Sequence, residues 1–323
     1  MELGVLLPHF SKECNWDRLI RFAPRIEQLG FDSVWVRDNL SYYGHGFEIE
    51  GNTFVDPFIT LSALAALTER LKLGTAVTIP FRHPLVTAQL VGSLSWISRG
   101  RAELGIGPGT PQKPFEITGI PYRDRIQLCK ETAEVMRCLA SGSPASYAGQ
   151  LTSFTDVTID PPPPASMPIW YGGASDFSIP RILDYCDGML PGRCPFRRYD
   201  IAAERLRTAG SEKGKRILLG SIPVISIGTT FEKAMAKIDY AIQPLYEYLT
   251  GHWKMPFETI KDLAGAVIVG TPDDFVEQLA AFAEREVDVV VLDARLLMGD
   301  FEETIERIGA DVLPKLRTVT GTT

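Results

Sequence analysis

Cysteine and histidine are both scarce in this sequence. The five cysteines among 323 residues are an odd number and form no CxxC pair, which argues against a disulfide framework and against a zinc ribbon. The four histidines are scattered, and neither an HExxH motif nor a cluster of carboxylates accompanies them. The pattern predicts no metal site and favours a reducing compartment such as the cytoplasm.

Long apolar runs and an excess of positive charge are also missing. No stretch approaches the roughly 20 apolar residues of a membrane helix, and Met1 leads into Glu2 without the basic start of a signal peptide. The formal net charge is -7 and the isoelectric point is about 5.3, so the overall field repels nucleic acids and anionic membranes. We therefore expect a cytoplasmic protein whose partners include neither a membrane nor a nucleic acid.

What the sequence does contain is a globular composition in which short apolar runs alternate with amphipathic segments. Hydrophobic residues make up 45% and charged residues 23%, and no break in composition divides the chain, so residues 1–323 are predicted to form one domain. Eight apolar runs are predicted to be strands: 3–7, 33–36, 71–79, 102–107, 168–171, 188–190, 217–227 and 287–292. Helical spacing predicts helices over 16–29, 57–68, 85–97, 124–139, 177–185, 199–209, 231–248, 273–285 and 302–316.

This alternation decides the predicted fold class. Nearly all-apolar strands separated by helices imply a parallel sheet covered on both faces, and eight such units close into a barrel. We therefore predict the α/β class and a (β/α)8 TIM barrel, with a hairpin around Tyr147 and Phe154 and a rigid proline run over 161–164 after the fourth unit. A doubly wound open sheet is the structural alternative.

Two glycine-rich segments follow predicted strands, at the end of a barrel where chemistry takes place. Gly105, Gly107 and Gly109 come at the end of the fourth strand, where glycines let the backbone turn tightly or approach a planar ligand. Gly172 and Gly173 follow the fifth strand shortly before a predicted helix, and free N–H groups there would suit a phosphate. A plain turn explains the first segment equally well.

Other short segments near the predicted strands complete this pattern: Leu73 to Thr78, Arg82-His83-Pro84, Arg99-Gly100-Arg101, Asp187-Gly188 and Val269 to Pro272. With the two glycine-rich segments, they make the chain from about Leu3 to Leu316 resemble the luciferase-like monooxygenase superfamily of flavin- and deazaflavin-dependent oxidoreductases. No single motif is decisive, but their order and spacing match along nearly the whole chain. The resemblance implies a bacterial-luciferase-like barrel with the cofactor ring lying across its C-terminal mouth.

The resemblance also implies roles for particular residues. It assigns the cofactor phosphate to the turn formed by Gly172, Gly173 and Ala174, and it implies a non-prolyl cis peptide bond between Thr75 and Ala76, behind the ring. Gly107 and Gly109 would line the ring. The cofactor tail would be held by Met189, Gly192 and Arg193, although a surface ion pair explains Arg193 equally well.

Four residues are candidates for contacting the substrate or moving a proton. Asp38 and Asn39 follow the second strand, where many deazaflavin-dependent relatives have Asp-His, and Asn39 can form hydrogen bonds but cannot shuttle a proton near neutral pH. His9 follows the first strand, and His45 lies in the loop from Asn39 to Phe54, which we expect to shape substrate specificity. Structural roles are the alternative for His9, Asp38 and His45.

The expected function is hydride exchange between coenzyme F420 and a small organic substrate. Gly107-Pro108-Gly109 and Phe81-Arg82-His83-Pro84 resemble the deazaflavin branch, and the long insertions of the two-component FMN enzymes are missing. An FMN-dependent monooxygenase that uses reduced flavin and oxygen is the alternative. A non-catalytic luciferase-like subunit is a third interpretation, against which the Gly172-Gly173 turn argues. The resemblance further implies a homodimer and a separate flavin or F420 reductase as partner.

Overall fold

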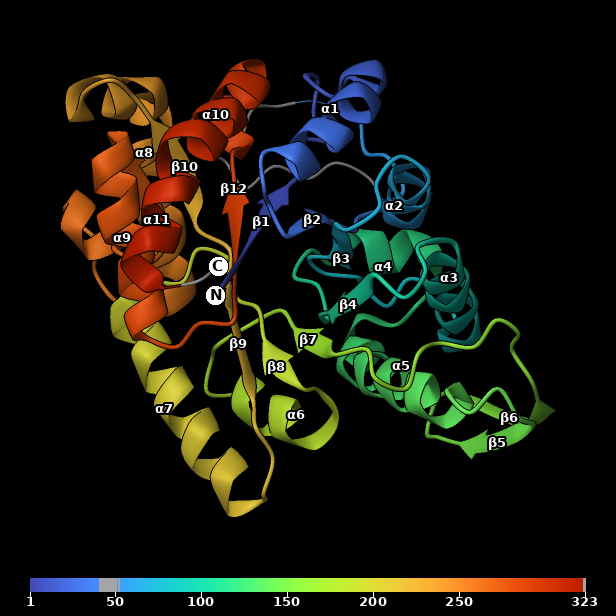
Figure 1. Cartoon of the computed structure of the whole chain (residues 1–323). Helices are drawn as coiled ribbons and strands as arrows, with labels where there is room; N and C mark the ends of the chain where they lie inside the picture. The colour runs from blue at the N-terminus through green and yellow to red at the C-terminus, as the bar shows by residue number, and fades with distance from the viewer. Residues whose placement is uncertain (41–50, 52, 322–323) are drawn as a thin grey trace.

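A closed ring of parallel strands lies at the centre of the computed structural model, which describes residues 1–40, 51 and 53–321 (Figure 1). The ring follows the order β1-β2-β3-β4-β7-β8-β9-β12, and pairing of β12 with β1 closes it. The prediction of a (β/α)8 barrel is confirmed. Its strands are β1 (Glu2–Leu6), β2 (Ser33–Val36), β3 (Lys72–Thr75), β4 (Ala102–Ile106), β7 (Ile169–Tyr171), β8 (Gly188–Met189), β9 (Leu218–Ser221) and β12 (Val289–Asp293).

Two further strands and a hairpin lie outside this ring. β10 (Val224–Ile227) follows β9 after Pro223, and it pairs with β11 (Val267–Gly270). Because proline has no N–H group to continue a ladder, the single strand predicted over 217–227 is divided into two. β11 was not predicted as a strand. β5 (Ala145–Ala148) and β6 (Ser153–Val157) form the predicted antiparallel hairpin.

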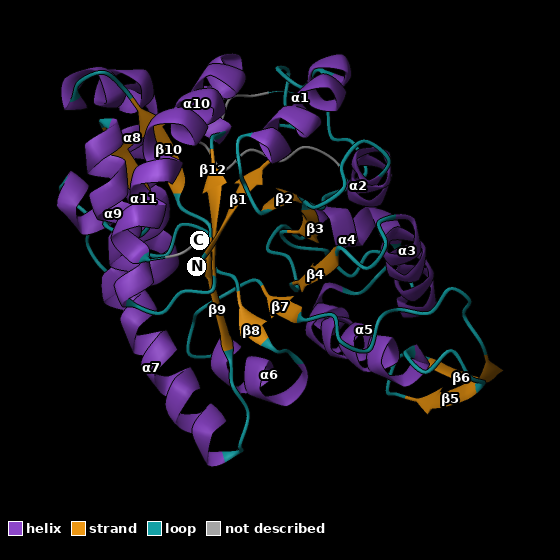
Figure 2. Ribbon diagram, in the orientation of Figure 1, coloured by secondary structure: helices purple, strands orange, loops and turns teal. Residues whose placement is uncertain are grey.

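Helices surround the ring (Figure 2), and several begin at a side chain that caps them. The side chain of Asn15 accepts the N–H of Arg18 at the start of α1, and Thr271 forms a capping box with Asp274 at the start of α9. The α-helices are α1 (Trp16–Gln28), α2 (Pro57–Ala65), α3 (Pro84–Ile97), α4 (Lys113–Thr118), α5 (Arg125–Leu139), α6 (Ser178–Tyr185), α7 (Phe196–Glu212), α8 (Phe231–Trp253), α9 (Pro272–Glu284), α10 (Phe301–Arg307) and α11 (Leu313–Thr320).

Several helices differ from the prediction. α4 was not predicted, and α7 and α8 are longer than expected. A π-helical turn (Ile308–Val312) separates α10 from α11 where one helix was predicted. Short 3-10 helices complete the connections: Tyr122–Asp124, Ile260–Leu263 and Arg295–Asp300. In the part of the chain that the structure describes, no helix has the length and apolarity needed to cross a bilayer.

Large side chains fill the inside of the barrel. Trp35 and Trp170 lie edge to face with ring centroids 6.4 Å apart. Gly4 leaves the space that Trp35 occupies, because a Cβ at Gly4 would lie 2.8 Å from Nε1 of Trp35. Leu6 and Leu190 belong to the same buried cluster, and both also line the cavity described below. The packed interior therefore forms the base of that cavity.

Candidate functional site

A cavity of about 240 Å³ opens at the C-terminal ends of the barrel strands, which is where active sites lie in this architecture. Small or apolar residues from the segments after β3, β4 and β7 form one part of its lining: Ala76, Val77, Ile79, Phe81, Gly107, Pro108, Pro111 and Gly172. Three arginines follow β2, β8 and β12: Arg37, Arg193 and Arg295. The other described lining residues are Leu6, Asp38, Asn39, Gly109, Thr110, Leu190, Gly192 and Ile222.

The peptide bond between Ala76 and Val77 is cis, so the prediction of a cis bond between Thr75 and Ala76 is wrong by one position. Thr75 is the last residue of β3. Its hydroxyl donates to the carbonyl of Gly105 at 2.9 Å and accepts the N–H of Gly105 at 3.1 Å. These bonds hold Thr75 against β4, and Thr75 is not among the described residues that line the cavity, whereas Ala76 is.

Gly107 and Gly172 lie beside Val77, and neither position has room for a side chain. A Cβ would lie 2.6 Å from Cγ2 of Val77 at Gly107, and 2.8 Å from the same atom at Gly172. Gly109 has a φ of 72°, in the left-handed region that favours glycine. Three predicted cofactor-binding glycines therefore lie together at the mouth, where the bare backbone allows a ligand to approach closely.

The turn predicted to bind phosphate lies only partly on the cavity. Gly172 lines it, but Gly173 and the buried Ala174 are not among the described lining residues. The N–H of Gly172 donates to the carbonyl of Ile106 at 2.9 Å, and the N–H of Gly173 donates to the carbonyl of Tyr171 at 2.9 Å. These two N–H groups are therefore not the free donors that we expected.

Gly192 and Arg193 line the cavity, but Met189, the third residue predicted to hold the cofactor tail, does not. Met189 is fully buried in the core, and the next residue, Leu190, faces the cavity instead, because successive side chains of a strand point to opposite faces. Arg193 is 9% exposed, and its Nη2 donates to the hydroxyl of Tyr248 in α8 at 3.2 Å. Arg193 is therefore buried at the mouth and does not lie on the surface, as the alternative of a surface ion pair assumed.

The two other arginines of the cavity, Arg37 and Arg295, were not predicted as site residues from the sequence. The guanidinium of Arg37 lies over the ring of Phe10 at 4.5 Å. The Nε of Arg295 donates to Oδ2 of Asp293 at 2.5 Å, and both side chains are almost completely buried. Their positions directly after β2 and β12 are the signal that could have identified them. The cavity of this acidic protein thus carries three guanidinium groups.

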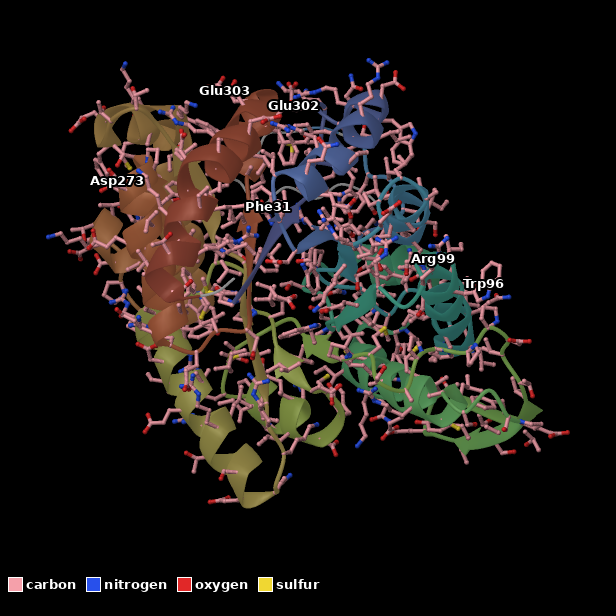
Figure 3. The ribbon with its side chains drawn as sticks, in the orientation of Figure 1. Phe31, Trp96, Arg99, Asp273, Glu302 and Glu303 are labelled. Carbon is pink, nitrogen blue, oxygen red and sulfur yellow. The ribbon has the colours of Figure 1, made fainter. Side chains whose placement is uncertain are left out.

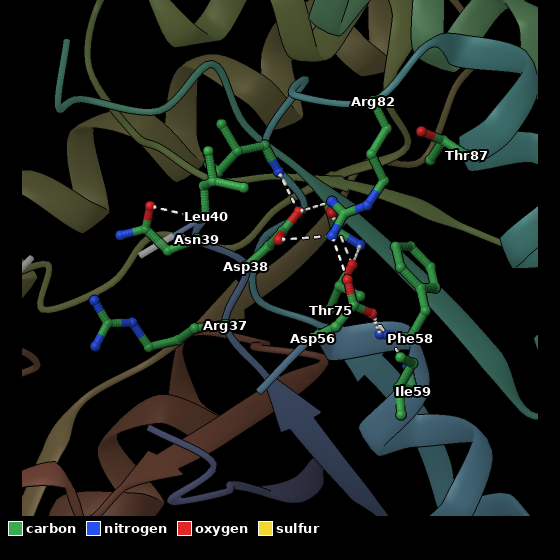
Figure 4. A network of polar contacts seen from close by, with 12 residues as sticks. Arg37, Asp38, Asn39, Leu40, Asp56, Phe58, Ile59, Thr75, Arg82 and Thr87 are labelled. Carbon is green, nitrogen blue, oxygen red and sulfur yellow. Dashed lines mark hydrogen bonds and ion pairs between the residues drawn. The ribbon is translucent and has the colours of Figure 1, made fainter. Parts of the chain in front are cut away.

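Asp38 is the centre of a network of ion pairs and hydrogen bonds (Figure 4). Its carboxylate accepts two hydrogen bonds from Arg82, at 2.6 and 3.2 Å, and a third from the N–H of Ile79 at 3.1 Å. Arg82 also donates to Asp56, the N-cap of α2, at 2.6 Å. Burial raises the pKa of Asp38, and Arg82 opposes this effect. The bidentate contact is the arrangement of an ionised carboxylate.

His9 is completely buried and does not belong to the described lining of the cavity. Its Nδ1 lies 3.0 Å from the carbonyl of Leu7, and its Nε2 lies 2.9 Å from the carbonyl of Arg37. Burial lowers the pKa of His9 to about 4, so the ring is neutral at pH 7 and donates to only one of these carbonyls. His9 joins the ends of β1 and β2 and is not placed to contact a substrate in the cavity.

Of the two remaining substrate candidates, Asn39 lines the cavity and His45 lies outside the described residues. The side-chain oxygen of Asn39 accepts the N–H of Leu40 at 3.0 Å. This bond identifies the oxygen end of the amide, and it leaves the NH2 group of Asn39 as the donor for a ligand.

A TIM barrel with a cavity at its C-terminal mouth, lined in part by glycines, has the architecture of a barrel enzyme whose active site lies at that end. The chain belongs to the luciferase-like monooxygenase family, whose model matches residues 1–288. It is 26% identical to the 5,10-methylenetetrahydromethanopterin reductase of Archaeoglobus fulgidus, over 98% of this chain and 100% of that relative.

Two solved structures show how widely this fold is used. An F420-dependent secondary alcohol dehydrogenase in complex with an F420-acetone adduct has a TM-score of 0.78 and 18% identity, covering 98% of this chain and 99% of that chain. The oxygenating constituent of 3,6-diketocamphane monooxygenase of Pseudomonas putida, in complex with FMN, has the same TM-score and identity, covering 98% of each chain. The equal scores show that the overall fold does not distinguish the two cofactors.

Proposed function

We propose that the protein is an oxidoreductase that uses coenzyme F420 to exchange hydride with a small organic substrate. The observation that supports this best is the recess of the cavity around Ala76 and Val77, which Gly107 and Gly172 line with bare backbone while the side chain of Val77 occupies the space that a Cβ at either glycine would need. Such a recess fits the flat ring of a deazaflavin or flavin. When bound, the deazaflavin supplies the hydride chemistry, and the protein supplies binding and orientation.

Different residues of the cavity would contribute to binding and orienting the cofactor. The glycines and Val77 set the depth to which a ring can enter, and Ile79 and Phe81 cover it with apolar surface that excludes water. Asn39 presents an NH2 group that can donate a hydrogen bond to a carbonyl of the cofactor or substrate.

Charge supports F420 over FMN. The cofactor tail of a deazaflavin is a polyanion, whereas FMN carries a single phosphate, and Arg193 lies in the cavity next to Gly192. The motifs Gly107-Pro108-Gly109 and Phe81-Arg82-His83-Pro84 also favour F420, because they resemble the deazaflavin branch. An FMN-dependent monooxygenase is the second candidate, because the FMN-bound structure from Pseudomonas putida matches this fold as well as the F420-dependent enzyme does.

Calorimetric titration of the protein with F420 and, separately, with FMN tests this proposal. Gly192 is a suitable position to perturb, because it lines the cavity and no atom of the described residues lies within 4 Å of a Cβ built there. Gly192→Asp should abolish binding of the anionic cofactor, and Gly192→Asn, of the same size without the charge, should retain most of it. Binding of FMN alone would favour the monooxygenase, and binding of neither cofactor would favour the non-catalytic subunit.

We further propose that a separate reductase supplies the reduced cofactor, as the family resemblance implies. Oxygen distinguishes the two candidate reactions. An F420-dependent enzyme should turn over at the same rate with and without oxygen, whereas an FMN-dependent monooxygenase should stop when oxygen is removed.

A homodimer through α2 and α3 is also proposed, because these two helices carry no charged residue and pack against each other. Ile59 of α2 is 65% exposed and Trp96 of α3 is 73% exposed, and Figure 3 shows Trp96 on the outside of the molecule. A two-fold axis would bury the same apolar face of both copies. Trp96→Glu should shift the protein from dimer to monomer in analytical ultracentrifugation. Phe177→Glu, at a 77% exposed residue outside this face, should not.

A further inference from the structure

The segment from Ala76 to Arg82 is fastened to Asp38 at two points. Oδ2 of Asp38 accepts the N–H of Ile79 at 3.1 Å and Nη1 of Arg82 at 2.6 Å, while Oδ1 accepts Nη2 of Arg82 at 3.2 Å. Within the turn so enclosed, the N–H of Phe81 donates to the carbonyl of Ile79 at 2.8 Å. We call this arrangement of Asp38, Ile79 and Arg82 the clip.

The clip fixes the positions of two apolar residues that line the cavity. Ile79 and Phe81 both line the cavity, and both lie inside the enclosed turn. The ring of Phe81 packs against Phe115 with centroids 4.9 Å apart. The same segment begins at Ala76 and Val77, which form the recess for the proposed ring. Movement of the clip would therefore move the recess and its apolar cover together.

Burial gives the clip its rigidity. The Asp38 side chain is 1% exposed and that of Arg82 is 20% exposed. Arg82 reaches Asp56 as well, so one guanidinium joins the end of β2, the segment after β3 and the N-terminus of α2. A planar guanidinium can hold two carboxylates in a fixed geometry, which a lysine ammonium cannot do.

The same contacts make Asp38 poorly suited to accept or donate a proton. Both carboxylate oxygens accept hydrogen bonds, and two of those bonds come from a cation that would have to be displaced before the group could take a proton. We propose that Arg82 and Asp38 are positioning residues that hold residues 76–82 in place for cofactor binding, and that Asp38 does not transfer protons. This inference rests on the proposed function for its effect on cofactor binding.

Two measurements test the proposal, one with the cofactor and one without it. Hydrogen–deuterium exchange reports whether residues 76–82 are held in place, and calorimetric titration reports F420 affinity. In Arg82→Met, exchange of this segment should be faster and F420 binding should weaken roughly ten- to a hundredfold, because small displacements around a bound ring are costly. Arg82→Lys keeps the charge without the fork, and it should fall between the wild type and Arg82→Met.

Arg101 provides a matched control at the opposite end of the same strands. It donates hydrogen bonds to the backbone carbonyls of Leu71, Ala65 and Thr68 at 2.6 to 3.0 Å. Arg101→Lys should lower the melting temperature while leaving both exchange in residues 76–82 and F420 affinity unchanged. An equal loss of affinity in Arg101→Lys would mean that general destabilisation, and not the clip, controls binding, which overturns the proposal.

A second-site variant separates positioning from loss of fold. In Arg82→Met the buried Asp38 carboxylate loses its cation, but Asp38→Asn/Arg82→Met has no buried charge and can still accept the N–H of Ile79. The double variant should regain stability but keep fast exchange and weak F420 affinity, because the anchor at Arg82 is still missing. Recovery of wild-type exchange and affinity would mean that the unpaired carboxylate, and not the loss of Arg82, loosens the segment, which would overturn the proposal. Wild-type exchange and affinity in Arg82→Met would refute the proposal. Binding of neither F420 nor FMN by the wild type would refute the proposed function, and the exchange data would still decide whether Arg82 holds the segment.

Discussion

Substitution of His9 by glutamine is expected to make the protein's stability less sensitive to acid. His9 is completely buried, and burial lowers its pKa from 6.5 to about 4. Above about pH 6.5 the ring is neutral in the folded and the unfolded chain, so its titration costs no stability. As the pH falls below that value, the unfolded chain binds a proton that the folded protein refuses, and stability is lost until the folded ring itself is protonated near pH 4.

The size of this effect follows from the two pKa values. A difference of about 2.5 corresponds to about 3 kcal/mol in total, of which about 2.5 kcal/mol is lost by pH 4.5. Urea unfolding at about pH 7.5 and about pH 4.5 measures it, with the wild type and His9→Gln compared at each pH. Carboxylates titrate alike in both proteins and cancel in the comparison. We expect the stability advantage of the wild type to shrink by about 2.5 kcal/mol at the lower pH.

An advantage that stays constant between the two pH values would refute this reasoning. So would a pKa near 6.5 for the His9 ring, measured by NMR in the folded protein. Either result would mean that His9 carries a proton that its two carbonyl neighbours stabilise, and that burial is not the dominant effect.

Substitutions at Gly107, Asn39 and Thr75 probe the cavity and its supports. Gly107→Ala should weaken F420 binding and cost about 1–3 kcal/mol of stability, because its new methyl group crowds Val77. Gly107→Ala/Val77→Ala should recover part of the stability in melting experiments and part of the F420 affinity in titrations. Asn39→Asp should reduce F420 affinity more than Asn39→Ser, because it replaces an NH2 donor by a negative charge; equal affinities would exclude this donor role. Thr75→Val should cost about 1–2 kcal/mol in urea unfolding without changing F420 affinity, because among the described residues its hydroxyl bonds only to Gly105.

The barrel was predictable because its signal is repeated along the chain. Each buried strand contributes a short apolar run, and each surrounding helix contributes its own periodicity, so one misjudged unit leaves the pattern intact. β11 was not predicted because its four apolar residues are too few for periodicity to distinguish a strand from a buried loop, and they follow an irregular segment after α8. Pro223, by contrast, was a visible reason to divide the strand over 217–227.

The site was less predictable because function depends on single positions within those units. Met189 and Leu190 are neighbours, yet only Leu190 faces the cavity, and the cis bond lies one position beyond the expected one. Motif matching places a segment at the mouth, but it does not determine which alternate side chain points inward. The burial of His9 and the pairing of Asp38 with Arg82 depend on residues far apart in the sequence, which no local pattern reveals.

The two tryptophans inside the barrel give the protein an optical property. Trp35 and Trp170 belong to the buried cluster whose members Leu6 and Leu190 form the base of the cavity. A flavin or deazaflavin bound above them would accept energy from their excited states, so occupancy of the cavity would dim their emission. Trp96 lies on the outer surface of α3, and Trp96→Phe would remove its background. The barrel thus contains its own fluorescent reporter of whether its mouth is filled.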